Sequence, residues 1–225
     1  MPASAVRHAY FHGFRSSPSA KKGLHLRDTF APEGIDFLLP DLNRPSFARL
    51  SVGAMLAHLD RLHEEEGRPA WRIVGSSLGG WLAARWAELH PGRVDRLVLL
   101  CPAFDIARRW PEMMSAGDFE RWRREGAIET EDASGTPARL HFAFYEEASA
   151  EVQWPRVRCP VTVVHGTRDE TVPITSSHRW VPEQADARLI EVDDTHDLLA
   201  SLDVVDRAVR DTFGIGQPAS STAEG

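Results

Sequence analysis

The segment Arg72–Trp86 reads R-I-V-G-S-S-L-G-G-W-L-A-A-R-W and contains the motif G-x-S-x-G at residues 75–79. A short apolar run precedes the motif, and apolar residues with helical spacing follow it: Leu78, Leu82, Trp86 and Leu89. A strand, a sharp turn and a helix in this order present the central serine at the tip of the turn. The positions two before and two after that serine must be small, because the two backbones nearly touch there, and Gly75 and Gly79 meet this need. The pattern predicts that Ser77 is a nucleophile at a helix N-terminus.

The composition is that of a globular α/β protein. The chain has 225 residues, of which 42% are hydrophobic and 26% charged, and its formal net charge is −7. This length accommodates one domain with a modest insertion. The acidic balance and the absence of a basic stripe make nucleic acid an unsuitable partner. Cys101 and Cys159 form neither a metal-ligand pattern nor a disulfide framework, so we expect free thiols and no metal or cofactor.

The termini and the hydropathy pattern bear on location. The first ten residues lack the apolar core of a signal peptide, and no apolar run approaches the length of a membrane span. We therefore expect a cytoplasmic protein that acts on a small molecule. A homodimer is compatible with the sequence, and the oligomeric state stays open.

Strand and helix patterns alternate along the chain. Apolar, β-branched runs predict strands at Val6–Phe11, Ile35–Leu39, Ile73–Val74, Val94–Cys101, Val161–His165 and Arg188–Val192. Helical spacing predicts helices after Ser17, over Ser51–Glu66, after Ser77, over Thr175–Val181 and over Leu198–Phe213. Ser17 and Pro18 are the expected N-cap and first residue of the first helix. This alternation predicts a mostly parallel twisted sheet with helices on both faces.

One stretch interrupts the alternation. We divide the chain into a core of residues 1–103 and 156–215, an insertion of residues 104–155 and a disordered tail of residues 216–225. In the insertion, Asp105–Arg124 predicts one or two short helices, with Asp105 and Asp118 as N-cap candidates. Alternating apolar residues at 140, 142 and 144 predict a β-hairpin of residues 127–131 and 139–145. Because the insertion follows the carboxyl end of a strand, we expect a small lid over the active crevice.

Residues suited to catalysis follow four of the predicted strands. In open parallel sheets the active crevice lies at the carboxyl ends of the strands. The loop His12-Gly13-Phe14, then Ser77, Asp169 and His196 occur in the order that the α/β version of the serine triad requires. His196 would take the proton of Ser77, and Asp169 would hold the imidazole.

Backbone N–H groups of Phe14 and Leu78 are the expected oxyanion donors. Among the histidines near the site, we expect His12 to brace this loop and His165 to pack at its strand end. The acids Glu170, Asp193, Asp194 and Asp197 compete with Asp169. The last three lie very close to His196 in sequence and are interpreted as a solvated loop.

These motifs resemble those of the α/β-hydrolase family over nearly the whole chain. The segments F-H-G-F-R-S-S-P-S-A-K-K and F-L-L-P-D-L-N are similar to the small YqiA-type bacterial esterases. Residues 126–147 and the segment C-P-V-T-V-V-H-G-T-R-D-E-T-V-P look more like the α/β-hydrolase depalmitoylases. The resemblance implies Ser77 as nucleophile, Asp169 as acid, His196 as base, and Phe14 and Leu78 as oxyanion donors. The segment after Cys101 is longer than in the YqiA-type esterases.

The insertion supplies the expected substrate contacts. An apolar lining by Phe14, Trp110, Met113 and Met114 favours an acyl or aryl group over a sugar or a phosphate. The arginines at 108, 109, 121, 123 and 124 either receive an anionic part of the substrate or form solvated helix faces. We predict a serine hydrolase that cleaves a carboxylic ester or thioester. The alternatives are an amide or C–C bond hydrolase with the same triad, and a non-catalytic binding protein on a hydrolase scaffold.

Overall fold

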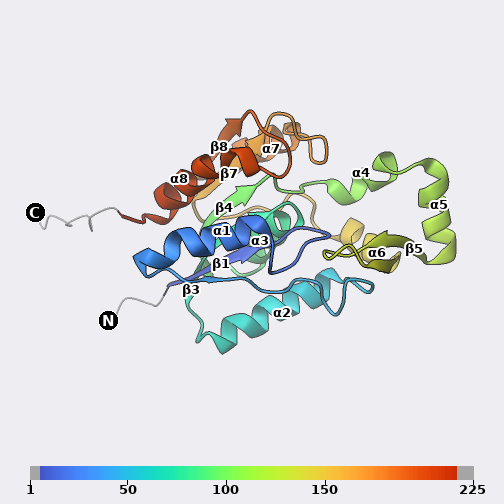
Figure 1. The fold of residues 1–225 in the computed structure, drawn as a ribbon, viewed down its shortest axis with the longest axis horizontal. Helices are drawn as coiled ribbons and strands as arrows, with labels where there is room; N and C mark the ends of the chain where they lie inside the picture. Colours follow the sequence, from blue (N-terminus) through green and yellow to red (C-terminus); the bar gives the residue numbers. More distant parts are fainter. Residues whose placement is uncertain (1–5, 217–225) are drawn as a thin grey trace, which may run out of the picture.

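The computed structural model describes residues 6–216, and a parallel sheet runs through their centre (Figure 1). Its six strands are β1 (Val6–Phe11), β2 (Phe37–Leu38), β3 (Ala70–Ser76), β4 (Val94–Leu100), β7 (Val161–Gly166) and β8 (Ala187–Val192). They lie in the order β2-β1-β3-β4-β7-β8, and every neighbouring pair is parallel. The predicted fold class is confirmed. All carboxyl ends of these strands therefore meet at one edge of the sheet.

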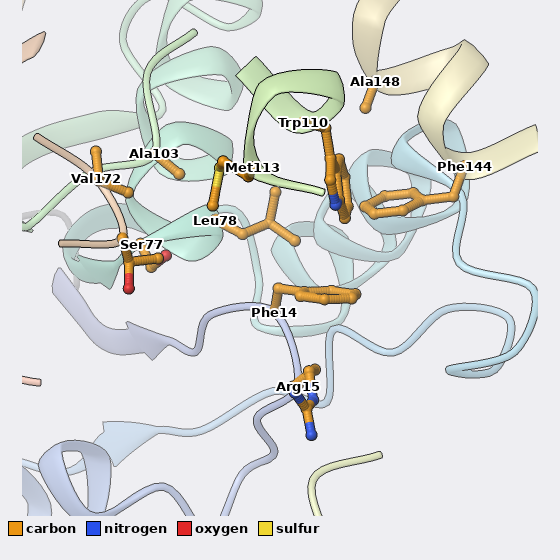
Figure 2. A pocket seen from close by; sticks show the side chains of 11 residues that line it. Phe14, Arg15, Ser77, Leu78, Ala103, Trp110, Met113, Phe144, Ala148 and Val172 are labelled. Carbon is orange, nitrogen blue, oxygen red and sulfur yellow. The ribbon is translucent and has the colours of Figure 1, made fainter. Parts of the chain in front are cut away.

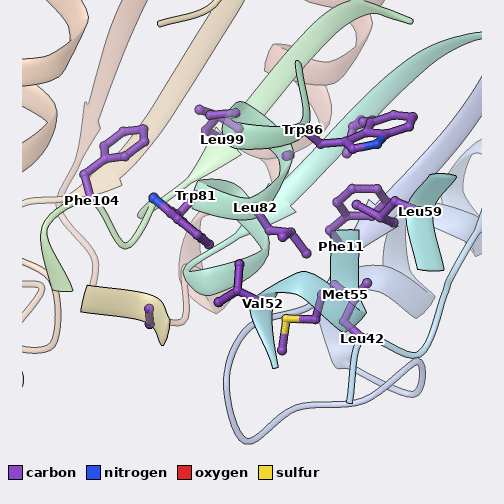
Figure 3. Packing of buried hydrophobic residues seen from close by; sticks show 14 of the residues in the cluster. Phe11, Leu42, Val52, Met55, Leu59, Trp81, Leu82, Trp86, Leu99 and Phe104 are labelled. Atoms are coloured by element: carbon purple, nitrogen blue, oxygen red, sulfur yellow. The ribbon is translucent and has the colours of Figure 1, made fainter. Parts of the chain in front are cut away.

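Helices cover both faces of the sheet. They are α1 (Lys21–Phe30), α2 (Val52–Glu65), α3 (Leu78–Leu89), α7 (Thr175–Trp180) and α8 (Leu202–Phe213), with 3₁₀ turns at Ala31–Glu33, Val181–Glu183 and Leu199–Ser201. Alternate residues of the central strands enter opposite cores, as in β4, where Leu97 and Leu99 join one core and Val98 joins the other. Figure 3 shows the first core, where α2 and α3 pack together. Burial on both faces explains why the central strands read as continuous apolar runs.

Two helix starts differ in how they are capped. Ser51 caps α2, since its Oγ accepts the N–H of Ala54 at 3.1 Å. The prediction for Ser17 was wrong, because α1 begins only at Lys21 and follows Ala20, which makes no side-chain cap. Ser17 instead accepts the N–H of Ser19 in a turn before the helix. A serine followed by proline fits such a turn as well as a helix start.

The insertion leaves the sheet after β4 and returns at β7. It contains α4 (Ile106–Met113), α5 (Ala116–Glu125), the hairpin strands β5 (Ala127–Glu131) and β6 (Pro137–His141), and α6 (Ala143–Ala150). These elements lie together at the right of Figure 1. The predicted pair of short helices is confirmed. The position of the insertion places it at the carboxyl edge of the sheet.

Two details of the insertion differ from prediction. Ser115 caps α5 by accepting the N–H of Asp118, so Asp118 is in the first turn and is not the cap, and Asp105 makes no side-chain cap before α4. The hairpin ends at His141, and Phe144 lies in α6 rather than in a strand. Phe144 and Ala148 are buried at a spacing of four, which is one face of a helix.

A carboxylate of the insertion joins it to the core. Glu147 of α6 accepts the N–H of Val52 at 3.0 Å, the N–H of Gly53 at 2.7 Å and the hydroxyl of Ser51 at 3.2 Å. The first N–H groups of a helix have no partner within the helix and favour a negative charge. Glu147 therefore anchors the insertion to the N-terminus of α2.

Three further expectations concern cysteines, membranes and the tail. Cys101 is buried, Cys159 is partly buried, and both are free. None of the helices within residues 6–216 is long and apolar enough to cross a membrane. Residues 217–225 of the predicted tail lie outside the described residues, as do residues 1–5.

Candidate active site

Ser77 occupies a strained position between β3 and α3. Its φ of 54° and ψ of −119° lie in a region of backbone conformation that non-glycine residues rarely adopt. A Cβ added to Gly75 would lie 2.6 Å from the carbonyl oxygen of Gly79, and a Cβ on Gly79 would collide with the carbonyl oxygen of Phe11. The close approach of strand and helix therefore excludes larger residues at both glycines, as the motif predicts.

The turn at Ser77 is held by backbone hydrogen bonds and not by the side-chain hydroxyl. Its backbone is fixed on both sides, because its N–H donates to Leu100 at 2.9 Å and its carbonyl accepts the N–H of Ala103 at 3.0 Å. The side chain makes no capping hydrogen bond to α3. Ser77 lines a cavity that residues of the insertion also line. Its Oγ is thus available to a substrate.

The loop after β1 lies directly against Ser77. A Cβ on Gly13 would be 3.1 Å from the Cβ of Ser77, so only glycine allows this approach. His12 is buried, its Nδ1 donates to the carbonyl of Gly13 at 2.9 Å, and its Nε2 accepts the N–H of Leu42 at 3.0 Å. Burial lowers the pKa of His12, so the ring is neutral and its two roles are fixed. His12 braces the loop, as expected.

Two backbone donors near Ser77 have no acceptor. Among residues 6–216, no backbone or side-chain group accepts the N–H of Phe14 or of Leu78. Leu78 is the first residue of α3, where N–H groups point out of the helix and the dipole is positive. Both residues also line the cavity. They have the free donors that an oxyanion hole requires.

Asp169 and His196 form a hydrogen-bonded pair. The Nδ1 of His196 donates to the Oδ2 of Asp169 at 2.7 Å. The other oxygen of Asp169 accepts the N–H groups of Thr171 and Val172, both at 2.8 Å. Asp169 follows β7 and His196 follows β8, and these strands are neighbours in the sheet. The parallel topology thus brings together two residues that are far apart in sequence.

The environment of Asp169 keeps it ionised. Burial by itself would raise the pKa of this carboxyl group. Hydrogen bonds from two histidine rings and from the N–H of Val172 outweigh burial and hold its pKa well below the ordinary value. Asp169 is therefore a carboxylate at neutral pH, and the Nε2 of His196 is left for a further partner.

The link from His196 to Ser77 is not a direct hydrogen bond here. Within the part of the chain that the structure describes, no hydrogen bond joins Ser77 to His196. The two are connected through the cavity, because Thr171 and Val172, which bind Asp169, line it together with Ser77. Catalytic hydrogen bonds are often long in ligand-free structures and tighten with substrate.

The competing acids are placed differently. Glu170 is exposed, and Asp193 is exposed and pairs with Arg168 at 2.7 Å. Asp194 is buried and its carboxylate accepts the N–H of Thr195, so its assignment to a solvated loop was wrong. The physical reason is local, since a short carboxylate can bond the backbone that follows it in a turn.

The cavity has a volume of about 250 Å³ and is largely apolar. Ser77 lies at one end, and Phe14, Trp110 and Phe144 gather at the other (Figure 2). The rings of Phe14 and Phe144 stack at 6.1 Å, and Trp110 meets Phe14 edge-on at 5.5 Å. Three elements far apart in sequence thus form one aromatic wall.

The predicted lining is only partly reproduced. Phe14, Trp110 and Met113 line the cavity, whereas Met114 lines only a separate hollow beside α5 and the hairpin of β5 and β6. Sequence reasoning missed the other lining residues, which are Arg15, Ala103, Phe144, Ala148, Thr171 and Val172. The only available signal was the position of residues 171 and 172, directly after Asp169.

The arginines of the lid are largely paired within it. Ion pairs join Arg108 to Asp105, Arg121 to Asp118, Arg123 to Glu120 and Arg124 to Glu125. These side chains are exposed, which agrees with solvated helix faces. At the cavity mouth, Arg15 pairs with Glu131 of the lid hairpin at 3.3 Å.

Comparisons with known proteins place the chain in context. It is 28% identical over 153 residues to the pimeloyl-[acyl-carrier protein] methyl ester esterase of Chromobacterium violaceum, which covers 53% of this chain and 60% of the relative. It is 28% identical over 158 residues to the mitochondrial palmitoyl-protein thioesterase ABHD10 of Mus musculus, covering 58% of this chain and 50% of the relative. The chain thus matches half to three fifths of the length of these two curated relatives.

Solved structures resemble it over nearly its whole length. Est1E from Butyrivibrio proteoclasticus superimposes with a TM-score of 0.74 at 19% identity, covering 93% of this chain and 87% of that one. The mouse α/β-hydrolase domain-containing protein 10 gives 0.72 at 20% identity, covering 94% and 92%. The fold is therefore that of the α/β-hydrolases. A family model matches residues 8–209, and the chain belongs to the family described as "Uncharacterised protein family (UPF0227)".

Proposed function

We propose that this protein is a serine hydrolase that cleaves a carboxylic ester or thioester through an acyl-enzyme on Ser77. The observation that carries the proposal is the Asp169–His196 hydrogen bond of 2.7 Å, made by a loop that lines the same cavity as Ser77. The strained turn and free hydroxyl of Ser77 add support. So do the names of two curated relatives, an ester esterase and a thioesterase.

The proposed reaction has two halves, the formation and the hydrolysis of the acyl-enzyme, and each catalytic group acts once in each half. The Nε2 of His196 takes the proton of Ser77 Oγ as the oxygen attacks the carbonyl carbon of the substrate. The N–H groups of Phe14 and Leu78 stabilise the negative oxygen of the tetrahedral intermediate. His196 then gives the proton to the departing alcohol or thiol. A water molecule repeats the sequence and releases the acid.

Asp169 has a specific task in this scheme. It accepts the Nδ1–H of His196, which leaves Nε2 unprotonated and able to act as a base. When His196 becomes an imidazolium, the buried carboxylate stabilises that charge.

The apolar cavity favours an acyl or aryl group as the part of the substrate that binds beside the insertion. Its aromatic wall leaves few polar groups to bind a sugar, and Arg15 at its mouth is already paired with Glu131.

A fluorophosphonate probe tests the nucleophile directly. We expect one covalent adduct on the wild-type protein by intact mass, located on Ser77 by peptide mapping, and none on Ser77→Ala. Ser76→Ala is the matched control, because Ser76 is the neighbouring buried serine and should leave labelling intact. A wild-type protein without an adduct, or labelling that persists in Ser77→Ala, would contradict the proposal.

Turnover separates the substrate classes. On p-nitrophenyl esters and acyl thioesters, Ser77→Ala should lower kcat by at least about 10³-fold. Anilides with the same acyl groups test amide cleavage in parallel. Faster hydrolysis of the anilides than of both oxygen and sulfur esters would overturn the assignment of substrate class.

A further inference from the structure

A second histidine lies behind the candidate triad. His165 is the penultimate residue of β7 and is fully buried. Its Nε2 lies 3.2 Å from the Oδ2 of Asp169 and 2.8 Å from the carbonyl oxygen of Val172. Its Nδ1 lies 2.7 Å from the hydroxyl of Ser177 on α7. His165 therefore packs at its strand end, as expected, and also contacts Asp169.

The neighbours of His165 fix where its proton lies. Both groups beside Nε2 are acceptors, since one is a carbonyl oxygen and the other a carboxylate, so Nε2 carries a hydrogen. Ser177 can donate to Nδ1 and has no other side-chain acceptor within residues 6–216. A hydrogen on Nε2, shared by its two acceptors, and an Nδ1 that accepts from Ser177 match all of these neighbours. Ser177 thus selects the tautomer that donates toward Asp169.

This arrangement completes the coordination of one carboxylate. A carboxylate can accept about four hydrogen bonds. Asp169 accepts two backbone N–H groups on Oδ1 and the Nδ1–H of His196 on Oδ2, and the Nε2–H of His165, which the carbonyl of Val172 shares at 2.8 Å, lies 3.2 Å from the same Oδ2. An apolar residue at position 165 would remove this N–H from Oδ2 and leave His196 as the ring that donates to it. The histidine is therefore placed to orient Asp169 rather than to fill space.

We propose that His165 is a positioning residue that holds the Oδ2 of Asp169 in line with His196 and limits the basicity of the catalytic imidazole. This inference rests on the proposed function for its kinetic consequence. An N–H donor beside the carboxylate spreads its negative charge, so removal of that donor strengthens the attraction between Asp169 and an imidazolium. Loss of the donor should thus raise the pKa of His196 and leave Asp169 less firmly oriented.

Other ionisable groups face this region and stay unchanged in the variants below. The Cys101 thiol, after β4, is buried against Asp169, and burial raises the pKa of that thiol. Lys22 of α1 donates to the carbonyl of Asp197 at 2.8 Å, and burial lowers the pKa of its ammonium group. Asp194 is buried in the loop that carries His196. A difference between His165 variants therefore reports on His165.

Three substitutions separate donation from packing. A glutamine amide reaches roughly the position of Nε2, so His165→Gln keeps a donor to Asp169. An asparagine amide reaches only the position of Nδ1, and His165→Asn and His165→Leu both lose the donor. His63→Leu is the control for removing a buried imidazole, because His63 of α2 packs against Trp86 of α3, away from the site.

Two measurements are made on each full-length variant. NMR titration gives the pKa of His196 without any need for turnover, and ester hydrolysis gives kcat and KM. We expect His165→Asn and His165→Leu to raise the His196 pKa by about 0.5–1 unit and to lower kcat about tenfold or more. KM should change less than about twofold. His165→Gln and His63→Leu should stay close to the wild type in both measurements.

The outcomes distinguish this inference from the proposed function. A wild-type protein without hydrolase activity defeats the proposed function, and the titration of His196 still decides whether His165 acts on the pair. Unchanged pKa and kcat in His165→Asn overturn the inference in an active enzyme. Equal impairment of His165→Gln and His165→Asn also overturns it, because that result marks a packing role. If His165→Leu does not fold, the glutamine and asparagine pair gives the answer.

Discussion

Replacement of Asp169 by asparagine should inactivate the enzyme while leaving it folded. The N–H groups of Thr171 and Val172 both donate to Oδ1, so the amide oxygen of the asparagine must occupy that position. Its NH₂ group then takes the place of Oδ2 and faces two histidine N–H groups. His196 can resolve this conflict only by moving its proton to Nε2. In that tautomer it cannot accept the proton of Ser77.

The expected loss follows from these contacts. The wrong tautomer in a serine triad lowers kcat by about 10⁴ in the well-studied proteases, and we expect about 10³–10⁴ here, or roughly 4–5.5 kcal/mol in activation free energy. The free energy of unfolding should fall by only about 1–3 kcal/mol, because two charge-assisted hydrogen bonds are lost while both backbone bonds remain.

The assay compares kcat/KM on a p-nitrophenyl ester with the midpoint of urea unfolding. Asp193→Asn is the matched control, since Asp193 is exposed and pairs only with Arg168. Its kcat/KM should stay within about twofold of the wild type. Retention of more than a tenth of wild-type kcat/KM by a folded Asp169→Asn protein would refute the assigned role of Asp169.

Three further predictions concern stability. Burial, with nearby guanidinium groups, lowers the pKa of His8 to about 4, so the unfolded chain binds more protons between pH 6.5 and 4 and stability falls as the pH is lowered through that window. His8→Phe should reduce the loss of unfolding free energy between pH 7 and pH 4 by about 2 kcal/mol, measured from the urea midpoints at the two pH values. The same pH dependence of stability in His8→Phe and the wild type would contradict this prediction. Gly79→Ala should unfold the protein or abolish probe labelling through its backbone collision, whereas Gly117→Ala, with open space around it, should be neutral or slightly stabilising by thermal unfolding. Glu147→Ala should lower the free energy of unfolding by about 1–2 kcal/mol through the lost helix cap, and Glu146→Ala, on an exposed position of the same helix, should not.

The sequence predicted the sheet and the placement of the candidate site because both follow from local rules. Alternation of strands and helices implies parallel strands, and parallel strands place Ser77, Asp169 and His196 at a common edge. The glycines of the motif report a backbone approach that the structure reproduces. Contacts that depend on the path of a loop could not be predicted from the sequence. The contact between His165 and Asp169 depends on a turn that brings the chain back after β7.

Ambiguous patterns account for the other differences. Phe142 and Phe144 alternate as in a strand, yet Phe144 and Ala148 have helical spacing, and the chain takes the helix. Met113 and Met114 are adjacent, and only the end of α4 decides which of them faces the cavity. In both cases tertiary packing, which one sequence does not reveal, selects between two local structures of similar free energy.

The insertion connects two neighbouring strands of the sheet, β4 and β7. Its length and composition can therefore change without disturbing the register of any strand in the sheet. A different insertion could be joined at the ends of β4 and β7, provided that it supplies an acidic side chain for the N-terminus of α2. Selection, in nature or in the laboratory, has access to new substrates through some fifty residues while the machinery beneath stays constant.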